Sequence, residues 1–449
     1  MLGVSIAHAI GTGVFYYVIY ILAAILMVGL ALGSRLDVQH HRSVILVAAT
    51  AIFTLVVVLS NGTPFGDFVK AYYPAGNLIV KNPDNVYFCA VSNACFVNLP
   101  ILAILFTPFS QLPLATAEAL FTIVGLWLIA WSAWRMSRGA HDWKGGAVII
   151  GLFALNGPLA YSLRLGNTTH HLLLVLLVGF EAACRGKRII AGVAMGFAAL
   201  IKPLLALFLF YFLLRRQFRI AAAMMGTACA VILASVILLG PDINVVFLRR
   251  FVLGFGSKPV IAYNVQNFSG MIGHLLMPGN LNNWIPLDEP MWFKASRISL
   301  SAIAALLVGF VFFRVSVPRQ ANEWMIELSA VLCLALLVAP VTWTHYLCLL
   351  LIPLSQFAIG RFPIPVGWTG KVAVVCTALL LSLPVLILPH NHLRFFTERL
   401  WISHYVWGAM LLLGLLLWGR IRIANAGAIS ARAVSARFES VGIPKGGVF

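Results

Sequence analysis

Residues 61–73 (NGTPFGDFVKAYY) place one carboxylate, Asp67, directly after an apolar segment that is long enough to cross a membrane. Lys70, Tyr72 and Tyr73 follow it. Only 13 of the 449 residues are Asp or Glu, so each acid at a membrane surface requires a physical reason. A positioned carboxylate can remove the proton of a reacting hydroxyl as a general base. An Asp after a turn is also typical of a helix N-cap, and the spacing leaves both interpretations open.

Two further residues could bind an anion beside such a base. Lys202 lies inside an apolar segment, in Ile201-Lys202-Pro203, where a charged group predicts function. Its alternative role is snorkelling or pairing with a backbone carbonyl at the helix break. His345 lies in the polar and aromatic run Thr342-Trp343-Thr344-His345-Tyr346 between two apolar segments, which indicates a cavity. A single structural hydrogen bond is the alternative for this histidine.

Other polar candidates flank the predicted membrane surface. Arg164 lies at a predicted helix end, where an interfacial anchor is the simple alternative. Arg250 precedes a polar and aromatic run that contains Asn264, Gln266 and Asn267. This run suits the binding of a sugar or a phosphate, and an ordinary loop explains it equally well.

The sequence predicts neither a metal site nor a cofactor. His170-His171 and His390-Asn391-His392 lack the acid and the spacing of a zinc site such as HExxH. No phosphate-binding P-loop, GxSxG nucleophile elbow or GxGxxG dinucleotide fingerprint occurs. Cys89 and Cys95 share the stretch 61–115 between two apolar segments, where an oxidising environment would permit a disulfide.

The elements that must position these residues are membrane helices. The chain is 61% hydrophobic and 10% charged, far from the roughly 25% charged content of soluble domains. We expect an all-α polytopic membrane protein in which residues 1–420 form one transmembrane domain and residues 421–449 form a basic cytoplasmic tail. Apolar runs of suitable length predict about twelve spans: 12–33, 43–60, 116–134, 146–163, 169–184, 189–214, 220–240, 298–314, 324–341, 346–360, 371–388 and 402–419.

Lys and Arg in short loops mark the cytoplasmic face of such a protein. Their distribution places two long stretches, residues 61–115 and 241–297, on the outer, periplasmic face of an inner membrane. The net charge of +18 then reflects contact with anionic membrane lipids rather than with nucleic acid. Segment 189–214 has basic clusters at both ends. It is therefore either a hairpin broken at Pro203, which we favour, or one kinked crossing.

Six short motifs in this order resemble glycosyltransferase family 87. This family of polytopic GT-C enzymes includes polyprenyl-phosphate-mannose-dependent mannosyltransferases. The resemblance spans most of the chain and rests on these motifs: Gly66-Asp67-Phe68 with Tyr72-Tyr73-Pro74-Ala75-Gly76, Phe106-Thr107-Pro108-Phe109, Arg164-Leu165-Gly166-Asn167, Ile201-Lys202-Pro203, Asn264-Val265-Gln266-Asn267-Phe268-Ser269 and Thr342-Trp343-Thr344-His345-Tyr346.

The resemblance implies a GT-C-like bundle with an outward-facing site, a lipid-linked sugar donor and transfer with inversion. The family's catalytic aspartate falls on Asp67 and its helix-end histidine on His345. The chain departs from the family where Gly-Gln-x-Asn is common, because it has Gly166-Asn167-Thr168-Thr169 there. The expected reaction moves mannose, or another hexose or pentose, from a polyprenyl-phosphate donor to a hydroxyl of a glycolipid or glycan acceptor, without a metal.

A polyprenyl phosphate leaves without a general acid, but it needs positive charge or hydrogen-bond donors around it. We expect these groups to bind the donor: Lys202, His345, Arg164, Arg250, Asn264, Gln266 and Asn267. We expect these to line the acceptor side or the cavity: Lys70, Tyr72, Tyr73, Asn167 and Trp343. A secondary transporter, or a flippase or ligase for a lipid-linked saccharide, is the alternative. A transporter explains the broken helix at Lys202 but not the two long outer stretches.

Overall fold

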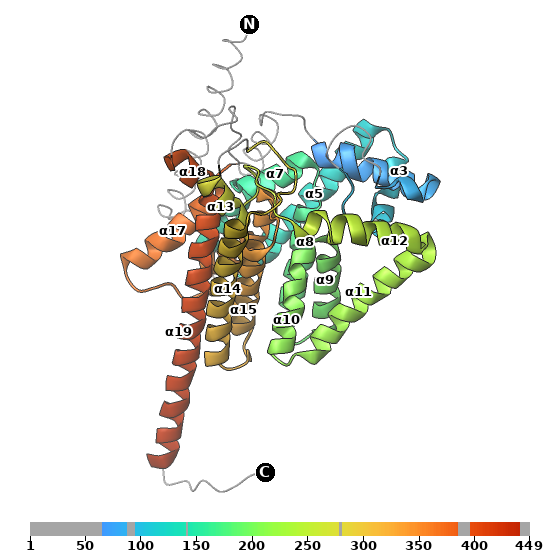
Figure 1. Ribbon diagram of the computed structural model, residues 1–449. Helices are drawn as coiled ribbons and strands as arrows, with labels where there is room; N and C mark the ends of the chain where they lie inside the picture. The colour runs from blue at the N-terminus through green and yellow to red at the C-terminus, as the bar shows by residue number, and fades with distance from the viewer. Residues whose placement is uncertain (1–64, 88–94, 141, 278–280, 385–395, 441–449) are drawn as a thin grey trace.

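The computed structural model describes residues 65–87, 95–140, 142–277, 281–384 and 396–440, and it describes their side chains except for Phe255, 396–398 and 427–440. The predicted spans 12–33 and 43–60 lie outside these residues. Within the described ranges the protein is a bundle of helices whose β pairing is limited to two isolated bridges. The all-α prediction is therefore confirmed for this part of the chain (Figure 1).

Five helices of the described part are long and apolar enough to cross a membrane. They are α5 (Leu114–Ser137), α11 (Phe218–Leu239), α14 (Met291–Arg314), α15 (Ala321–Val338) and α19 (His404–Ser440). The pair α6 (Trp143–Ala154) and α7 (Gly157–Leu165) adds a sixth if it counts as one bent span. The predicted number of about twelve is not confirmed, since the other apolar helices have only 10–17 residues.

The bend between α6 and α7 measures 46°. Asn156 causes it, because its side-chain oxygen accepts a hydrogen bond from Leu159 N at 2.9 Å and so caps a new helix. Pro158 occupies the first turn of that helix, where its missing N–H costs nothing. The sequence predicted one span over 146–163, because an apolar run does not reveal a break of this kind.

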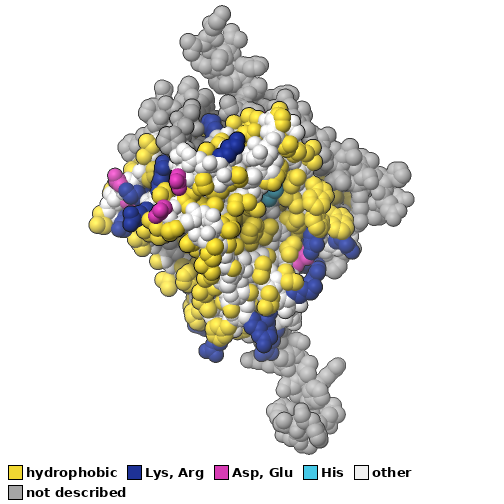
Figure 2. All heavy atoms as spheres, turned by 90° about the vertical axis from the view of Figure 1, so that its right-hand side faces the viewer, with side chains coloured by type: hydrophobic (Ala, Val, Ile, Leu, Met, Phe, Trp, Pro, Cys, Tyr) yellow, Lys and Arg dark blue, Asp and Glu magenta, His cyan; other side chains and the backbone are white. Residues whose placement is uncertain are grey.

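Helix α15 forms the centre of the bundle, with 83% of its apolar window buried, against 11% for α11 and 22% for α5 and α14. The peripheral helices expose large apolar side chains such as Leu233, Ile237 and Phe313. Figure 2 shows a long face of the molecule covered mainly by hydrophobic side chains, with Lys and Arg at its lower end and a second group, beside Asp and Glu, at its upper left. Such a surface belongs in lipid, and the protein is a multi-pass membrane protein.

The segment around Lys202 turns back on itself. Helix α8 (Thr169–Cys184) leads to α9 (Arg188–Ile201), and the chain breaks at Lys202 before a short 3₁₀ turn and α10 (Leu207–Leu214). Gly192 packs against residues 220–224 of α11, and Gly196 packs against residues 224–227, so α9 and α11 run in the same direction.

Helix α10 must therefore return to the face from which α9 started. Arg188 and Arg219 accordingly line one and the same cavity. This is the hairpin arrangement, with Lys202 at its apex.

The predicted outer stretches contain short helices instead of long loops. The first holds a π-helical segment (Phe68–Tyr72), α3 (Tyr73–Lys81), a 3₁₀ segment (Pro100–Phe106) and α4 (Thr107–Ser110). The second holds α12 (Pro241–Phe247) and α13 (Phe268–Leu276). The second stretch ends at Pro290 rather than 297, since the first two turns of α14 contain the charged Lys294 and Arg297, which an apolar window excludes.

The remaining elements complete the bundle. A 3₁₀ segment (Thr344–Leu350) continues into α16 (Leu351–Ala358), and α17 (Trp368–Ser382) and α18 (Phe396–Ile402) precede α19. Helix α19 continues through the predicted tail as far as Ser440.

At the end of the bundle where α10 and α11 meet, Arg215 and Arg420 both bind the fully buried Glu327, at 2.5 Å and 2.7 Å. We call this end the basic end.

Candidate active site

Asp67 occupies the N-cap position of the π-helical segment Phe68–Tyr72, but its side chain does not cap that segment. It lies in the first turn after Phe65, whose φ of 57° and N–H bond to Arg164 O (2.7 Å) fix the entry of the chain. Its side chain makes no capping hydrogen bond. Instead, Asn167 Nδ2 donates to Asp67 Oδ2 at 2.6 Å. Of the two interpretations that the sequence leaves open, the N-cap position is therefore found without its capping hydrogen bond, and the half-buried carboxylate points toward another element.

Asn167 holds that carboxylate from the turn between α7 and α8. Gly166 adopts a left-handed conformation (φ 63°) that ends α7 and aims Asn167 inward. The Asn167 Oδ1 atom accepts hydrogen bonds from Thr169 N at 3.1 Å and from Thr169 Oγ1 at 2.8 Å. Because the oxygen is engaged there, the amide NH₂ group must face Asp67. It lies 3.3 Å from the Tyr72 hydroxyl as well.

Lys202 approaches the same amide from the hairpin apex. Its Nζ atom donates to Asn167 Oδ1 at 3.4 Å and lies 4.1 Å from the centre of the Tyr346 ring. The side chain is almost completely buried, so the aromatic face replaces part of the lost hydration of the ammonium group. Asp67, Asn167, Lys202 and Tyr346 thus form a polar cluster from four separate elements, which we call the Asp67 cluster.

His345 lies beside this cluster with polar atoms to spare. Its ring centre is 4.8 Å from that of Tyr346 and 6.1 Å from that of Tyr161. Both ring nitrogens are buried and have no hydrogen-bond partner among the described residues. Buried polar atoms are normally paired, so two unpaired nitrogens at one position indicate a place for a ligand or for water.

A short backbone pairing brings the two polar and aromatic motifs together. Val265 and Trp343 form an antiparallel bridge, and Gln266 N donates to Thr342 O at 2.7 Å. The Asn264 side chain lies between aromatic groups, since its Nδ2 contacts the Tyr161 hydroxyl at 3.4 Å and its Oδ1 accepts from Trp284 Nε1 at 3.0 Å. Asn264, Trp343 and His345 therefore lie on one side of the cluster.

The Gln266 and Asn267 amides bind backbone instead. Gln266 Nε2 donates to Ile402 O at 2.7 Å, and Asn267 caps α13 while its Nδ2 donates to Ala339 O at 2.7 Å. Both side chains thus stabilise the wall of the site. Direct contact of Asn267 with a donor requires its bonds to break. The Gln266 Oε1 atom is buried and has no partner among the described residues, so it can still accept a hydrogen bond from a ligand.

Other predicted site residues lie further from the carboxylate. Lys70 is exposed but close enough to influence the charge of Asp67. The Tyr73 hydroxyl donates to Leu112 O at 2.8 Å, and Arg250 Nη1 donates to Tyr87 O at 2.9 Å. Arg164 lies near enough to influence the ionisation of Tyr263.

The first outer stretch also carries a disulfide. Cys95 is disulfide-bonded, and Cys89, its predicted partner, lies outside the described residues.

Four side chains of the site were not among the predicted site residues: Tyr161, Thr169, Trp284 and Tyr346. Tyr346 belongs to a motif that carries the resemblance, so that motif contained the signal. Tyr161 lies three residues before the motif that begins at Arg164. Thr169 holds Asn167 in place exactly where the chain departs from the family pattern. Trp284 had no signal, because it enters the site through a long connection without a motif.

Burial raises the pKa of Asp67 above the usual range. The hydrogen bond from Asn167 and the positive charges of Lys202 and Lys70 oppose this rise without cancelling it. A carboxylate with a raised pKa is a stronger base when ionised, which suits the removal of a proton from a hydroxyl. Among the described residues, no three His, Cys, Asp or Glu side chains gather as metal ligands.

Comparison with known proteins places this sequence in a family. Residues 96–340 match the sequence model of glycosyltransferase family 87, which is more than half of the chain. The chain is also similar to the polyprenol-phosphate-mannose-dependent alpha-(1-2)-phosphatidylinositol mannoside mannosyltransferase of Mycolicibacterium smegmatis. The two are 25% identical over 358 residues, which is 74% of this chain and 78% of that protein. The chain therefore belongs to glycosyltransferase family 87 and is a membrane glycosyltransferase.

Proposed function

We propose that this enzyme transfers mannose from a polyprenyl-phosphate donor to a hydroxyl of a glycolipid or glycan acceptor, with Asp67 as the general base. The Asp67 cluster is the observation that carries the proposal. It places a half-buried carboxylate and a buried ammonium group on opposite sides of one fixed amide, Asn167.

In the proposed reaction the acceptor oxygen attacks the anomeric carbon of the sugar while Asp67 takes the hydroxyl proton. The bond between that carbon and the phosphate oxygen breaks, and its electron pair leaves with the polyprenyl phosphate. Attack opposite the leaving group inverts the anomeric configuration. A phosphate leaving group needs no proton, so one base is sufficient.

Lys202 is the cation that we assign to the donor phosphate. Its ammonium group is held by one oxygen and one aromatic ring, neither of which carries a negative charge, so its charge remains available to an anion. The unpaired nitrogens of His345 lie beside Tyr346 and could bind the same phosphate or the sugar. Low polarity around these groups strengthens their attraction to the charge that develops on the leaving group.

The donor class rests on the similarity to the mannosyltransferase from Mycolicibacterium smegmatis, whose name states that it depends on polyprenol-phosphate-mannose and acts on a phosphatidylinositol mannoside. The proposed outer, periplasmic location of the site rests on charge. The Asp67 cluster lies at the start of α8, and the basic end lies past Cys184, 16 residues or about 24 Å along that helix. Basic ends face the cytoplasm, so the cluster faces the opposite side.

Substitution Asp67→Asn tests the assignment of the base. It keeps the shape and the hydrogen-bonding capacity of the side chain but removes its ability to accept a proton. We expect a loss of sugar transfer of about 10²–10⁴-fold, measured with purified enzyme, polyprenyl-phosphate-mannose and a glycolipid acceptor.

The matched control for this test is Asp84→Asn, an exposed acid of the same outer segment, which should keep full activity. Undiminished transfer by a folded Asp67→Asn variant would exclude the proposed mechanism.

The proposed chemistry uses side chains alone, so a chelator should not slow it. We expect EDTA to leave the initial rate of transfer unchanged when the enzyme is assayed without added divalent metal. An EDTA-dependent loss that Mg²⁺ or Mn²⁺ restores would show that a metal takes part.

A further inference from the structure

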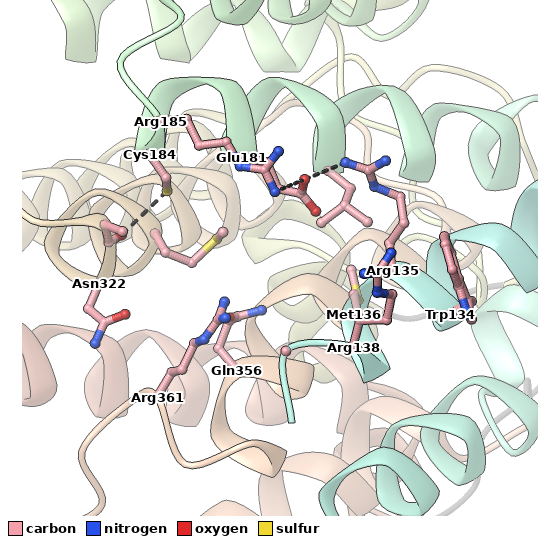
Figure 3. A pocket seen from close by; sticks show the side chains of 14 residues that line it. Trp134, Arg135, Met136, Arg138, Glu181, Cys184, Arg185, Asn322, Gln356 and Arg361 are labelled. Atoms are coloured by element: carbon pink, nitrogen blue, oxygen red, sulfur yellow. Dashed lines mark hydrogen bonds and ion pairs between the residues drawn. The ribbon is translucent and has the colours of Figure 1, made fainter. Parts of the chain in front are cut away.

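A cavity lined by arginines lies at the basic end, away from the Asp67 cluster, and has a volume of about 600 Å³ (Figure 3). It is separate from the cavity that Arg188 and Arg219 line. The ends of α5, α8 and α16 and the start of α15 surround it. Its lining includes four arginines and one acid: Arg135, Arg138, Arg185, Arg361 and Glu181. None of these residues takes part in the proposed transfer reaction.

The charges in this cavity do not balance. Glu181 is shared by Arg135 and Arg185, whose guanidinium groups both contact its Oε2 atom. Within the described part of the chain, no carboxylate pairs with Arg138 or Arg361. One negative charge against four positive charges leaves an excess of three, which favours an anion.

Arg138 and Arg361 are held in place by neutral groups. The Arg138 guanidinium lies 4.9 Å from the centre of the Trp134 ring. Arg361 Nη1 donates to the Oε1 atom of the buried Gln356 at 3.5 Å. The Nε atom of Arg135 is buried and lacks a partner within the described residues. Arginine side chains oriented this way can donate several hydrogen bonds to a phosphate group.

The surface next to the cavity belongs in lipid. Trp127, Trp131 and Trp134 recur at helical spacing on one face of α5, and their exposed fractions are 60%, 37% and 52%. Tryptophan is typical of the boundary between hydrocarbon and headgroups. A molecule that places a phosphate against the arginines can thus lay acyl chains along this tryptophan face.

We infer that the arginine-lined cavity between α5, α8, α15 and α16 binds the phosphate group of an anionic phospholipid. This inference does not depend on the proposed reaction, because it involves none of the residues of the Asp67 cluster. A basic pocket between membrane helices is suited to such headgroups. A soluble phosphate could use the same arginines, so the test must separate the two sources.

The test compares full-length wild-type protein with the double variant Arg138→Gln/Arg361→Gln. The control is Arg314→Gln/Arg422→Gln. These two arginines also lie over aromatic rings, 5.0 Å from Phe310 and 5.6 Å from Trp418, and do not line the cavity.

Native mass spectrometry in detergent measures retention of phosphatidylglycerol and of phosphatidylcholine. The unfolding temperature in phosphatidylcholine establishes that each variant is folded. If the double variant is unfolded, the single variant Arg361→Gln replaces it.

We expect the wild type and the control to retain phosphatidylglycerol in preference to phosphatidylcholine, and the cavity variant to retain at least tenfold less of it. Equal retention by all three proteins overturns the inference. Excess inorganic phosphate forms the second arm. One outcome is that inorganic phosphate raises the unfolding temperature of the wild type and the control only, while the wild type retains both lipids equally. That result would support a phosphate site but contradict the inference that a phospholipid supplies the phosphate.

Discussion

At the scale of single residues, the central feature is one asparagine that contacts both a base and a cation. Asn167 uses its NH₂ group toward Asp67 and its oxygen toward Lys202 and Thr169. The opposite charges are thus separated by a neutral amide and do not form a direct ion pair. A direct ion pair would hold the carboxylate ionised but would lower its basicity.

The raised pKa of Asp67 predicts the acid side of the pH profile. Only the carboxylate form of Asp67 accepts a proton, so kcat/KM should fall as the pH drops through this pKa. The midpoint should lie above about 4, the pKa of an ordinary Asp. A profile of kcat/KM against pH measures it, and a midpoint at or below that value contradicts the buried environment.

Substitution Asn167→Ala should move this midpoint to higher pH. It removes the hydrogen bond that favours the ionised carboxylate, while burial remains. Asn85→Ala, at an exposed position of the same outer segment, is the control and should leave the profile unchanged. An unshifted profile for Asn167→Ala would mean that the amide only positions the carboxylate.

The sequence identified Asp67 because acids are rare in this chain, and Lys202 because it lies inside an apolar segment. It identified His345 from a polar and aromatic run and Asn167 from a motif of the family resemblance. It could not show how they meet. The contact between Lys202 and Asn167 depends on where the hairpin turns, and the orientation of the Asn167 amide depends on Thr169. Arg250 shows the limit of this reasoning, since its side chain binds the Tyr87 carbonyl.

At the scale of elements, the turn between α7 and α8 positions the site. Gly166 has φ 63°, and a Cβ atom there would lie 2.6 Å from Phe68 Cβ, next to Asp67 in the chain. Gly186 ends α8 with a similar φ of 70°, but a Cβ atom there meets nothing within 4 Å. The two glycines thus share backbone strain and differ in their neighbours.

Substitution Gly166→Ala should abolish most sugar transfer, because the new methyl group must displace Phe68 and with it Asp67. Gly186→Ala is the matched control and should cost only the strain of a left-handed alanine, about 1–2 kcal/mol, with transfer retained. Activity and unfolding temperature are measured for both. Equal activity in the two variants would contradict the role of this turn.

Helix boundaries could be predicted only where they coincide with apolar runs. The basic clusters at both ends of 189–214 indicated the hairpin, because charge distribution reports sidedness directly. The break at Asn156 has no such signal in an apolar sequence. The first two turns of α14, which contain Lys294 and Arg297, were likewise placed in a loop by an apolar window.

At the scale of the whole molecule, the buried charges of the basic end join three helices. Glu327 of α15 accepts hydrogen bonds from Arg215, from Arg420 of α19 and from the Tyr211 hydroxyl of α10. Removing the charge of the fully buried Glu327 leaves Arg215 without a carboxylate partner among the described residues. It leaves Arg420 only its longer contact with Glu323, at 3.4 Å. The cluster therefore links the hairpin to the central helix and to α19.

We expect Glu327→Gln to destabilise the protein by about 3–5 kcal/mol, measured as a lower unfolding temperature in detergent. Asp288→Asn is the control, because Asp288 forms a single exposed ion pair with Lys258 at 2.6 Å. Exposed pairs contribute little, so this control should unfold at the wild-type temperature. Equal effects of the two substitutions would contradict a structural role for the buried cluster.

The hairpin of α9 and α10 has a consequence for membrane insertion. A segment that starts and ends at the same face leaves the chain on the side of the membrane where it began. The orientation of α11 and of every later helix is therefore independent of whether 188–214 has inserted. The chain can thus acquire its final topology before the hairpin is seated. The ammonium group of Lys202 can then enter last, once Asn167 and Tyr346 are in place to receive it.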